Sequence, residues 1–208
     1  MPLFVLAGYT GSGKTDVLHL LQQKGQQVIN LEALASHNGS VFGHLPHNKP
    51  PSSYHFHKSL IRKWKGFDLS KPVFCENKAS TLGSLQIPQW LFQHMQQAPM
   101  IWVEVTKEIR LQRLLSVYGN IEPLDFKQAL CKLSNRLTEQ QIPKIVDAFE
   151  LGKKELVFQA LMEYYDQGLY YKQTPERIIG EVTMNETSAE NMLQILKLAE
   201  SFFPALQP

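Results

Sequence analysis

One short stretch near the N-terminus limits what this chain can fold into more than any other. Residues 4–21 read FVLAGYTGSGKTDVLHLL, an apolar run followed by a glycine-rich loop and then by apolar residues at helical spacing. The pattern G-x-x-x-x-G-K-[ST] begins here at Gly8 and ends at Thr15, and it requires a buried strand before the loop and a helix after it. Because both are present, the stretch predicts a phosphate-binding loop on an α/β core.

The residue types of this loop suit a polyphosphate. Glycines let successive backbone N–H groups turn toward phosphate oxygens, and the following helix adds the positive end of its dipole. Lys14 would bring a positive charge to the terminal phosphates, and the Thr15 hydroxyl would be a ligand of Mg²⁺. The residues expected to contact the ligand are Gly8, Thr10, Gly11, Ser12, Gly13, Lys14 and Thr15.

Apolar runs alternate with helical patterns along the first half of the chain. Besides residues 3–7, strands are expected at 26–32, 71–76 and 99–105, and helices at 14–23, 54–64, 88–97 and 107–118. Strands that alternate with helices in this way are typical of a parallel sheet covered on both faces. We therefore predict an α/β fold like that of P-loop NTPases, with a mainly parallel sheet covered by helices.

After Tyr118 the pattern is almost wholly helical. Helices are expected at 123–137, 143–151, 153–165 and 188–202, with one late strand at 177–184. A chain of 208 residues can bury one substantial core. We expect a single P-loop domain over residues 1–208, with an α/β core at 1–118 and a mostly helical part at 119–208.

Composition restricts the function only weakly. The net charge is +2, which gives mild support to a polyanionic partner but does not require one. Cys75 and Cys131 form neither a disulfide framework nor a zinc-type spacing, which favours a reducing compartment. The sequence has neither a signal peptide pattern nor an apolar run of about 18 residues. We therefore expect a cytoplasmic protein that does not span a membrane.

Several polar residues lie where they would meet a ligand of the loop. Glu76 ends the third strand and is a candidate for Mg²⁺ binding and catalysis, although an exposed acid at a strand end would look the same. Asn30 and Glu32 follow the second strand at the same expected edge, or else cap a helix. Arg110 and Arg113, one helical turn apart, are candidates to reach the phosphates, or they form a solvated helix face.

Three other groups of residues suggest weaker hypotheses. Five histidines lie close in sequence, but their irregular spacing and the absence of a nearby cysteine favour a phosphate- or RNA-contacting loop over zinc. A tyrosine-rich stretch suits stacking on unpaired tRNA bases, or else packs in the core. The basic stretch 57–66 is either an RNA contact or one polar helix face. The histidines are His37, His44, His47, His55 and His57, and the tyrosines are Tyr164, Tyr165, Tyr170 and Tyr171.

Five segments together point to a known family. They read GYTGSGKT, NLEALASHNGSVFG at 30–43, ENKASTLGSLQIP at 76–88, QAPMIWVEVTKEIRLQRLL at 97–115 and EYYDQGLYY at 163–171. This combination resembles the P-loop domain of tRNA 2-selenouridine synthase. The resemblance covers nearly the full chain, and its most specific part is LEALASHNGSVFG.

The resemblance implies an enzyme of tRNA modification. In that family the wobble 2-thiouridine of certain tRNAs is S-geranylated from geranyl diphosphate and then converted to 2-selenouridine with selenophosphate. A rhodanese-like domain with a reactive cysteine precedes the P-loop domain there. Because this chain begins at the P-loop strand, we expect tRNA and a separate rhodanese-like protein, supplied in trans, as its partners.

The chain departs from the family pattern at several polar positions. Asn30 stands where the family usually has Asp, and Asn38 where it has Arg. Lys78, Ala79 and Ser80 stand where it has an acid, a hydroxyl and an arginine. Lost charges of this kind affect how a diphosphate and a tRNA backbone are held.

Two alternatives to the tRNA-modifying transferase remain open. One is an ATP-dependent small-molecule kinase, in which Arg110 and Arg113 would close on the transferred phosphate. The other is a divergent, non-catalytic nucleotide-binding protein. The expected phosphate ligand is accordingly geranyl diphosphate, ATP or GTP, bound with Mg²⁺.

Overall fold

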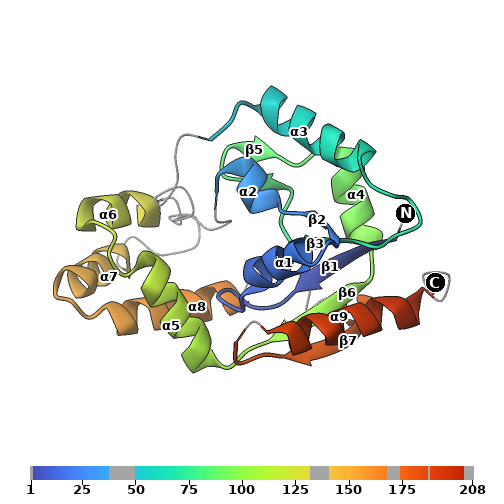
Figure 1. Ribbon diagram of the computed structural model, residues 1–208. Coiled ribbons are helices and arrows are strands. Elements are labelled where there is room, and N and C mark those ends of the chain that lie inside the picture. The colour runs from blue at the N-terminus through green and yellow to red at the C-terminus, as the bar shows by residue number, and fades with distance from the viewer. Residues whose placement is uncertain (1, 38–49, 132–140, 168–173, 187, 204–208) are drawn as a thin grey trace.

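A five-stranded sheet lies at the centre of the molecule, in a computed structural model that describes residues 2–37, 50–131, 141–167, 174–186 and 188–203 (Figure 1). All its strands run parallel, in the order β2-β3-β1-β6-β7. The strands are β1 (Leu3–Ala7), β2 (Gln27–Ile29), β3 (Val73–Glu76), β6 (Met100–Glu104) and β7 (Ile178–Thr183). A separate antiparallel pair consists of β4 (Thr81–Leu82) and β5 (Leu85–Gln86).

Helices cover both faces of the sheet. On one face lie α1 (Lys14–Gln23) and α9 (Ala189–Phe202), and on the other lie α2 (Leu31–Ala35), α3 (Ser53–Lys65) and α4 (Gln89–Gln97). Successive residues of β1 point to opposite faces. Phe4 and Leu6 belong to the core beneath α1 and α9, and Val5 belongs to the core on the other face. Burial on both faces explains why β1 reads as a continuous apolar run.

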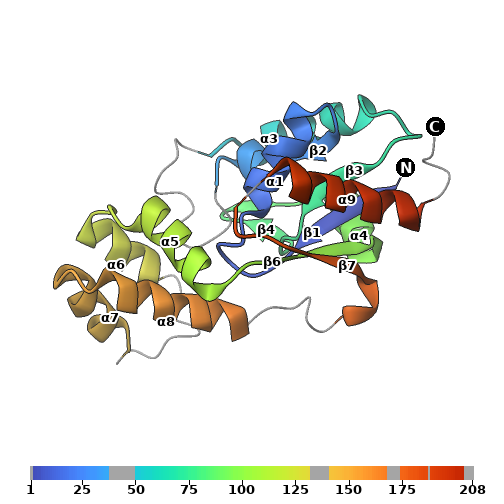
Figure 2. The ribbon, with the colours of Figure 1, turned by 60° about the horizontal axis from the view of Figure 1, so that its bottom comes forward.

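Four helices form a group to one side of the sheet, as Figure 2 shows. They are α5 (Lys107–Tyr118), α6 (Pro123–Cys131), α7 (Gln141–Glu150) and α8 (Lys154–Gln167). This group has its own aromatic core, in which the rings of Phe126 and Phe149 stack with centroids 4.0 Å apart and Phe158 packs against both. After α8 the chain returns through the short 3-10 helix η2 (Pro175–Arg177) to the sheet, where β7 and α9 complete the fold.

The predicted α/β fold class is confirmed, including the parallel sheet with helices on both faces. The second strand is shorter than expected, because Asn30 caps α2: its Oδ1 accepts a hydrogen bond of 2.9 Å from the Ala33 N–H. A helix capped at Asn30 was one of two alternatives, and the β4–β5 pair was not expected. Of the helix expected at 123–137, the structure describes the part up to Cys131, and the remainder lies outside the described residues.

None of the described helices is long and apolar enough to cross a membrane.

Truncation of Phe4 tests how α9 is held on the sheet. The Phe4 ring is fully buried, stacks on Phe74 with a centroid distance of 5.7 Å and meets Phe202 and Phe203 edge-on. We predict that Phe4→Ala lowers the free energy of unfolding by about 3–5 kcal/mol, because a large aromatic side chain leaves a cavity. Urea denaturation measures this. As a control, Leu156→Ala on exposed α8 surface should stay within about 0.5 kcal/mol of wild type.

Candidate functional site

The loop between β1 and α1 has the backbone shape that its glycines allow. Gly11 and Gly13 have φ angles of 79° and 77°, in the left-handed region that favours glycine. A Cβ atom on Gly8 would lie 2.5 Å from the Val103 carbonyl oxygen. No side chain caps the start of α1 at Gly13, so the first backbone N–H groups of that helix are available to an anion.

Lys14 lies folded over this loop. Its Nζ donates hydrogen bonds to the Gly8 and Tyr9 carbonyl oxygens, at 2.8 and 2.9 Å, and to Ser12 Oγ at 3.0 Å. Desolvation, followed by the charge of Lys78, lowers the pKa of Lys14 to about 7. An anion beside the ammonium would favour its charged form. The loop therefore holds Lys14 where a phosphate group would stabilise its charge.

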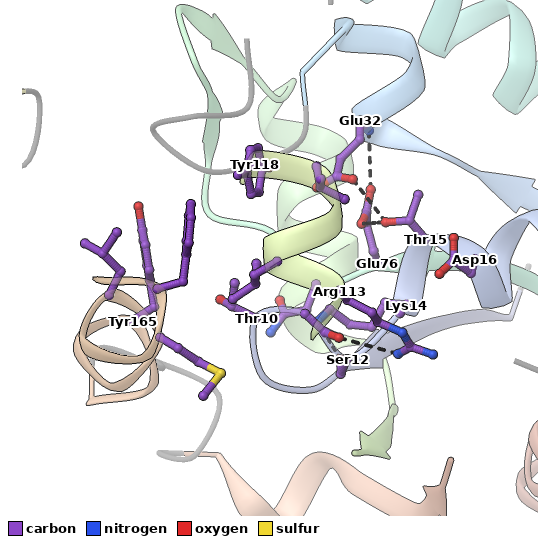
Figure 3. A pocket seen from close by; sticks show the side chains of 18 of the residues that line it. Thr10, Ser12, Lys14, Thr15, Asp16, Glu32, Glu76, Arg113, Tyr118 and Tyr165 are labelled. Atoms are coloured by element: carbon purple, nitrogen blue, oxygen red, sulfur yellow. Dashed lines mark hydrogen bonds between the residues drawn. The ribbon is translucent and has the colours of Figure 1, made fainter. Parts of the chain in front are cut away.

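Two carboxylates converge on the Thr15 hydroxyl, as the dashed lines in Figure 3 show. Thr15 Oγ1 lies 3.0 Å from Glu32 Oε2 and 3.3 Å from Glu76 Oε2. The backbone N–H of Glu32 also donates to Glu76 Oε1, at 3.3 Å. Parallel pairing places Leu6 of β1 opposite Glu76 of β3, which brings this acid next to the loop. Burial raises the pKa of Glu76, and the neighbouring Lys78 opposes that shift.

Lys78 lies between the same two acids. Its Nζ donates a hydrogen bond to Glu32 Oε1 and lies 3.2 Å from Glu76 Oε2. The two carboxylates raise the pKa of Lys78 above its ordinary value despite burial. Sequence analysis had placed Lys78 only among the departures from the family pattern. Its central position depends on the approach of α2 to the end of β3, which no local sequence signal reveals.

As they stand, these residues do not fit a magnesium ion. The oxygens of Thr15, Glu32 and Glu76 are of the kind that Mg²⁺ prefers. However, the Lys78 ammonium already satisfies both carboxylates. Within the described ranges, no group of three or more His, Cys, Asp or Glu residues could hold a metal ion. The expected roles of Thr15 and Glu76 as metal ligands stay predictions.

The two arginines of α5 lie in different places. The Arg110 guanidinium is buried, forms a bidentate pair with Asp166 at 2.9 and 2.7 Å, and donates to the Thr10 carbonyl oxygen at 3.1 Å. It also lies 4.7 Å from the centroid of the Tyr9 ring. This geometry favours a structural role in bracing the loop over the expected contact with phosphate. Arg113 instead lines the cavity described next, and it donates to the Gly11 carbonyl oxygen at 3.4 Å.

A cavity of about 700 Å³ lies between the phosphate loop and the helices α5 and α8. Its polar end consists of the loop, the two acids, Lys78 and Arg113. Apolar and aromatic side chains of α5 and α8 form the opposite end: Leu114, Val117, Tyr118, Phe158, Leu161, Met162, Tyr164 and Tyr165. Figure 3 shows Tyr118 and Tyr165 on the side away from Thr15 and the acids. The cavity therefore joins a phosphate site to an apolar compartment.

The remaining sequence candidates lie apart from one another or outside the described residues. His55 Nδ1 lies 2.8 Å from Ser52 Oγ, and His57 Nε2 lies 2.9 Å from the Gln86 carbonyl oxygen. His37 is buried beside Gly83. Five further candidates lie outside the described residues: Asn38, His44, His47, Tyr170 and Tyr171.

The phosphate loop, the helix after it and the parallel sheet define a P-loop domain. The chain belongs to the family described as the tRNA 2-selenouridine synthase AAA domain, whose profile matches residues 1–200. The tRNA 2-selenouridine synthase of Nitrosomonas europaea is 27% identical over 90% of this chain and 46% of its own length. That of Shewanella pealeana is 37% identical over 56% of this chain and 31% of its own length. The chain thus spans less than half the length of these relatives.

A solved structure is similar to this chain over nearly the whole length of both proteins. The crystal structure of TT1252 from Thermus thermophilus matches 97% of this chain and 97% of its own, with 15% sequence identity and a TM-score of 0.51. At this level of identity the likeness concerns the fold alone.

Removal of Asp166 tests whether the Arg110 pair stabilises the loop. We predict that Asp166→Ala lowers the free energy of unfolding by about 3 kcal/mol, because it leaves a buried guanidinium without its counter-charge. Chemical denaturation measures the change. Glu163→Ala, on the exposed surface of the same helix, is the matched control and should change stability by less than about 0.5 kcal/mol. Equal midpoints for the two variants would contradict the bracing role.

Proposed function

We propose that this chain binds geranyl diphosphate and takes part in transfer of the geranyl group to the sulfur of a wobble 2-thiouridine in tRNA. The observation that carries the proposal is the single cavity that joins the phosphate loop to an apolar compartment. A prenyl diphosphate has the same division, with a charged group at one end and a hydrocarbon chain at the other. Membership of the family described as tRNA 2-selenouridine synthase AAA domain supports a role in tRNA modification, and the geranyl donor is what the sequence resemblance implies.

The polar end of the cavity suits a diphosphate leaving group. As sulfur attacks the first carbon of the geranyl chain, the carbon–oxygen bond breaks and its electron pair leaves with the diphosphate, while the thiouridine N3 proton is released. Negative charge therefore grows on the diphosphate oxygens. Lys14, Arg113 and the loop N–H groups would stabilise that charge.

The apolar end supports a prenyl ligand over the kinase alternative. Leu114, Val117, Phe158, Leu161 and Met162 offer hydrocarbon contact, and the hydrogen-bonding groups beside them are the hydroxyls of Ser116, Tyr118, Tyr164 and Tyr165. Burial of a hydrocarbon chain among such residues is favourable by about 25 cal/mol per Å² of apolar area.

The arginine geometry argues in the same direction. The kinase alternative has both Arg110 and Arg113 close on the transferred phosphate, but Asp166 and the Thr10 carbonyl engage the Arg110 guanidinium. The described structure thus leaves Arg113 as the arginine of this pair that lines the cavity.

A tRNA and a rhodanese-like domain complete the proposal. The full-length relatives are named tRNA 2-selenouridine synthases and are more than twice as long as the part matched here. A rhodanese-like domain would add the sulfur- or selenium-handling cysteine. On α3, the exposed side chains of Lys58, Arg62 and Lys65 share one helix face at spacings of four and three residues. We propose this face as a contact for tRNA phosphates.

The two ends of the cavity can be tested separately by calorimetric titration with geranyl diphosphate, inorganic pyrophosphate and ATP. Lys14→Ala should weaken the binding of both geranyl diphosphate and pyrophosphate. Val117→Asp places a carboxylate at the rim of the apolar end, where the side chain is 49% exposed, so the protein should still fold. We predict that it weakens the binding of geranyl diphosphate by about tenfold or more, since the bound hydrocarbon chain would desolvate the new carboxylate. The affinity for pyrophosphate should stay unchanged.

Leu156→Asp, at an exposed position of α8 outside this cavity, is the control for Val117→Asp on α5 and should bind both ligands as wild type does. Equal affinity of the wild-type chain for geranyl diphosphate and pyrophosphate would contradict the prenyl proposal. Tight binding of ATP, without measurable binding of geranyl diphosphate, would favour the kinase or nucleotide-binding alternatives.

The α3 face predicts salt-dependent tRNA binding. In filter-binding assays across a salt series, the combined change Lys58→Ala, Arg62→Ala and Lys65→Ala should reduce the slope of log affinity against log salt by about 2 to 3, because each cation that neutralises a phosphate contributes about 0.7 to 0.9. The control combines three exposed lysines from other elements, Lys24, Lys107 and Lys197, each changed to Ala. If both triple variants lower the slope equally, α3 is not the contact.

A further inference from the structure

The positive charge between Glu32 and Glu76 is the ammonium group of a side chain, Lys78. Glu32 lies in the first turn of α2, Glu76 ends β3, and Lys78 follows two residues after that strand. Three separate backbone segments, including the Thr15 end of the loop, therefore meet at one point. There the Lys78 ammonium contacts one oxygen of each carboxylate.

Burial favours a positive charge at this point. The Glu76 side chain is fully buried, and Glu32 and Lys78 keep only 11% and 15% of their side-chain exposure. Two ionised carboxylates so close together, and largely out of water, repel one another, and a counter-charge offsets that repulsion. In a P-loop protein a divalent metal commonly supplies it. Here Lys78 supplies it in the structure as it stands.

The surroundings of Lys78 oppose a second cation. Lys14 is close enough for the two ammonium charges to interact, since Lys78 contributes to lowering the pKa of Lys14. A magnesium ion requires near-octahedral oxygen ligands at about 2.0–2.1 Å. To take the Glu32 and Glu76 oxygens it would have to displace the Lys78 ammonium from both hydrogen bonds. It would then add two positive charges beside Lys14.

Lys78 is also placed to contact a ligand of the phosphate loop. A lysine ammonium carries three N–H donors, and the two carboxylates account for two of them. Lys78 lines the same cavity as the phosphate loop, where the diphosphate would lie, so one donor remains for that ligand. We propose that the Lys78 ammonium is the built-in counter-cation of this site, in place of a divalent metal, so that the loop binds diphosphate without requiring Mg²⁺. This rests on the phosphate-binding part of the proposed function and is independent of prenyl transfer.

The first test uses the wild-type chain and inorganic pyrophosphate. Calorimetric titration is carried out with excess Mg²⁺ and again with the metal removed by a chelator. We expect the two dissociation constants to agree within about threefold, a difference of less than 1 kcal/mol. A loss of pyrophosphate binding on chelation would overturn the proposal, and this result depends on no variant.

Variants then show whether Lys78 causes the independence from metal. With chelator, Lys78→Ala should weaken pyrophosphate by about tenfold or more, the loss expected for a charge-assisted hydrogen bond, and Mg²⁺ should restore much of the binding. Lys78→Arg keeps the charge and should remain insensitive to Mg²⁺. Lys71→Ala is the matched control, because Lys71 also pairs with an acid, Asp68 at 3.8 Å, but on exposed surface. Metal-independent binding by Lys78→Ala would contradict the proposal.

Direct metal binding separates this inference from the proposed function. Electron paramagnetic resonance of Mn²⁺, without any phosphate ligand, should show no bound ion on the wild-type chain and a bound ion on Lys78→Ala. Adding Glu76→Gln to that variant should abolish the bound ion and, by removing the unpaired buried charge, help the protein fold. Mn²⁺ binding by the wild type would overturn the role of Lys78. If the wild type binds pyrophosphate under neither condition, the phosphate-site proposal fails, while the Mn²⁺ result still tests Lys78.

Discussion

The parallel pairing of β1 with β3 is the constraint on which the rest of the site depends. It places the start of the glycine-rich loop beside Glu76, because the carboxyl ends of adjacent parallel strands lie at the same edge. A backbone hydrogen bond of 2.8 Å from the Asn77 N–H to the Leu6 carbonyl oxygen continues this pairing past the strand end. The loop that carries Lys78 is thereby held next to the loop that carries Lys14, and α2 brings Glu32 to both.

The sequence predicted those parts of the molecule that local residue types determine. The loop from Gly8 to Thr15, the apolar strands and most helices follow from spacing and residue type alone, and the family resemblance agrees with the family profile. The predicted end of the second strand was less exact. Asn30 was included in that strand, but its side chain caps the helix α2 instead. Asparagine is a favoured N-cap, so this boundary had a sequence signal.

Contacts between residues that are distant in the sequence could not be predicted from local residue types. Arg110 was a candidate phosphate contact or part of a solvated helix face, and neither interpretation included Asp166, because this partner lies 56 residues away and nothing local links the two. Lys78 was noted only as a departure from the family pattern, since its two acids come from α2 and β3. The apolar compartment was invisible for the same reason: α5 and α8 are each recognisable as helices, but only their packing shows that Val117 and Phe158 face one cavity.

The Arg110 bridge also gives the cavity a mechanical property. One guanidinium holds the Thr10 carbonyl of the phosphate loop and both oxygens of Asp166 on α8, so the two ends of the cavity share a rigid connection. A displacement of α8 by the hydrocarbon chain of the proposed ligand would be transmitted to the loop, and a tightening of the loop around phosphate would be transmitted to α8. The free energies of binding the two halves of such a ligand would then be coupled.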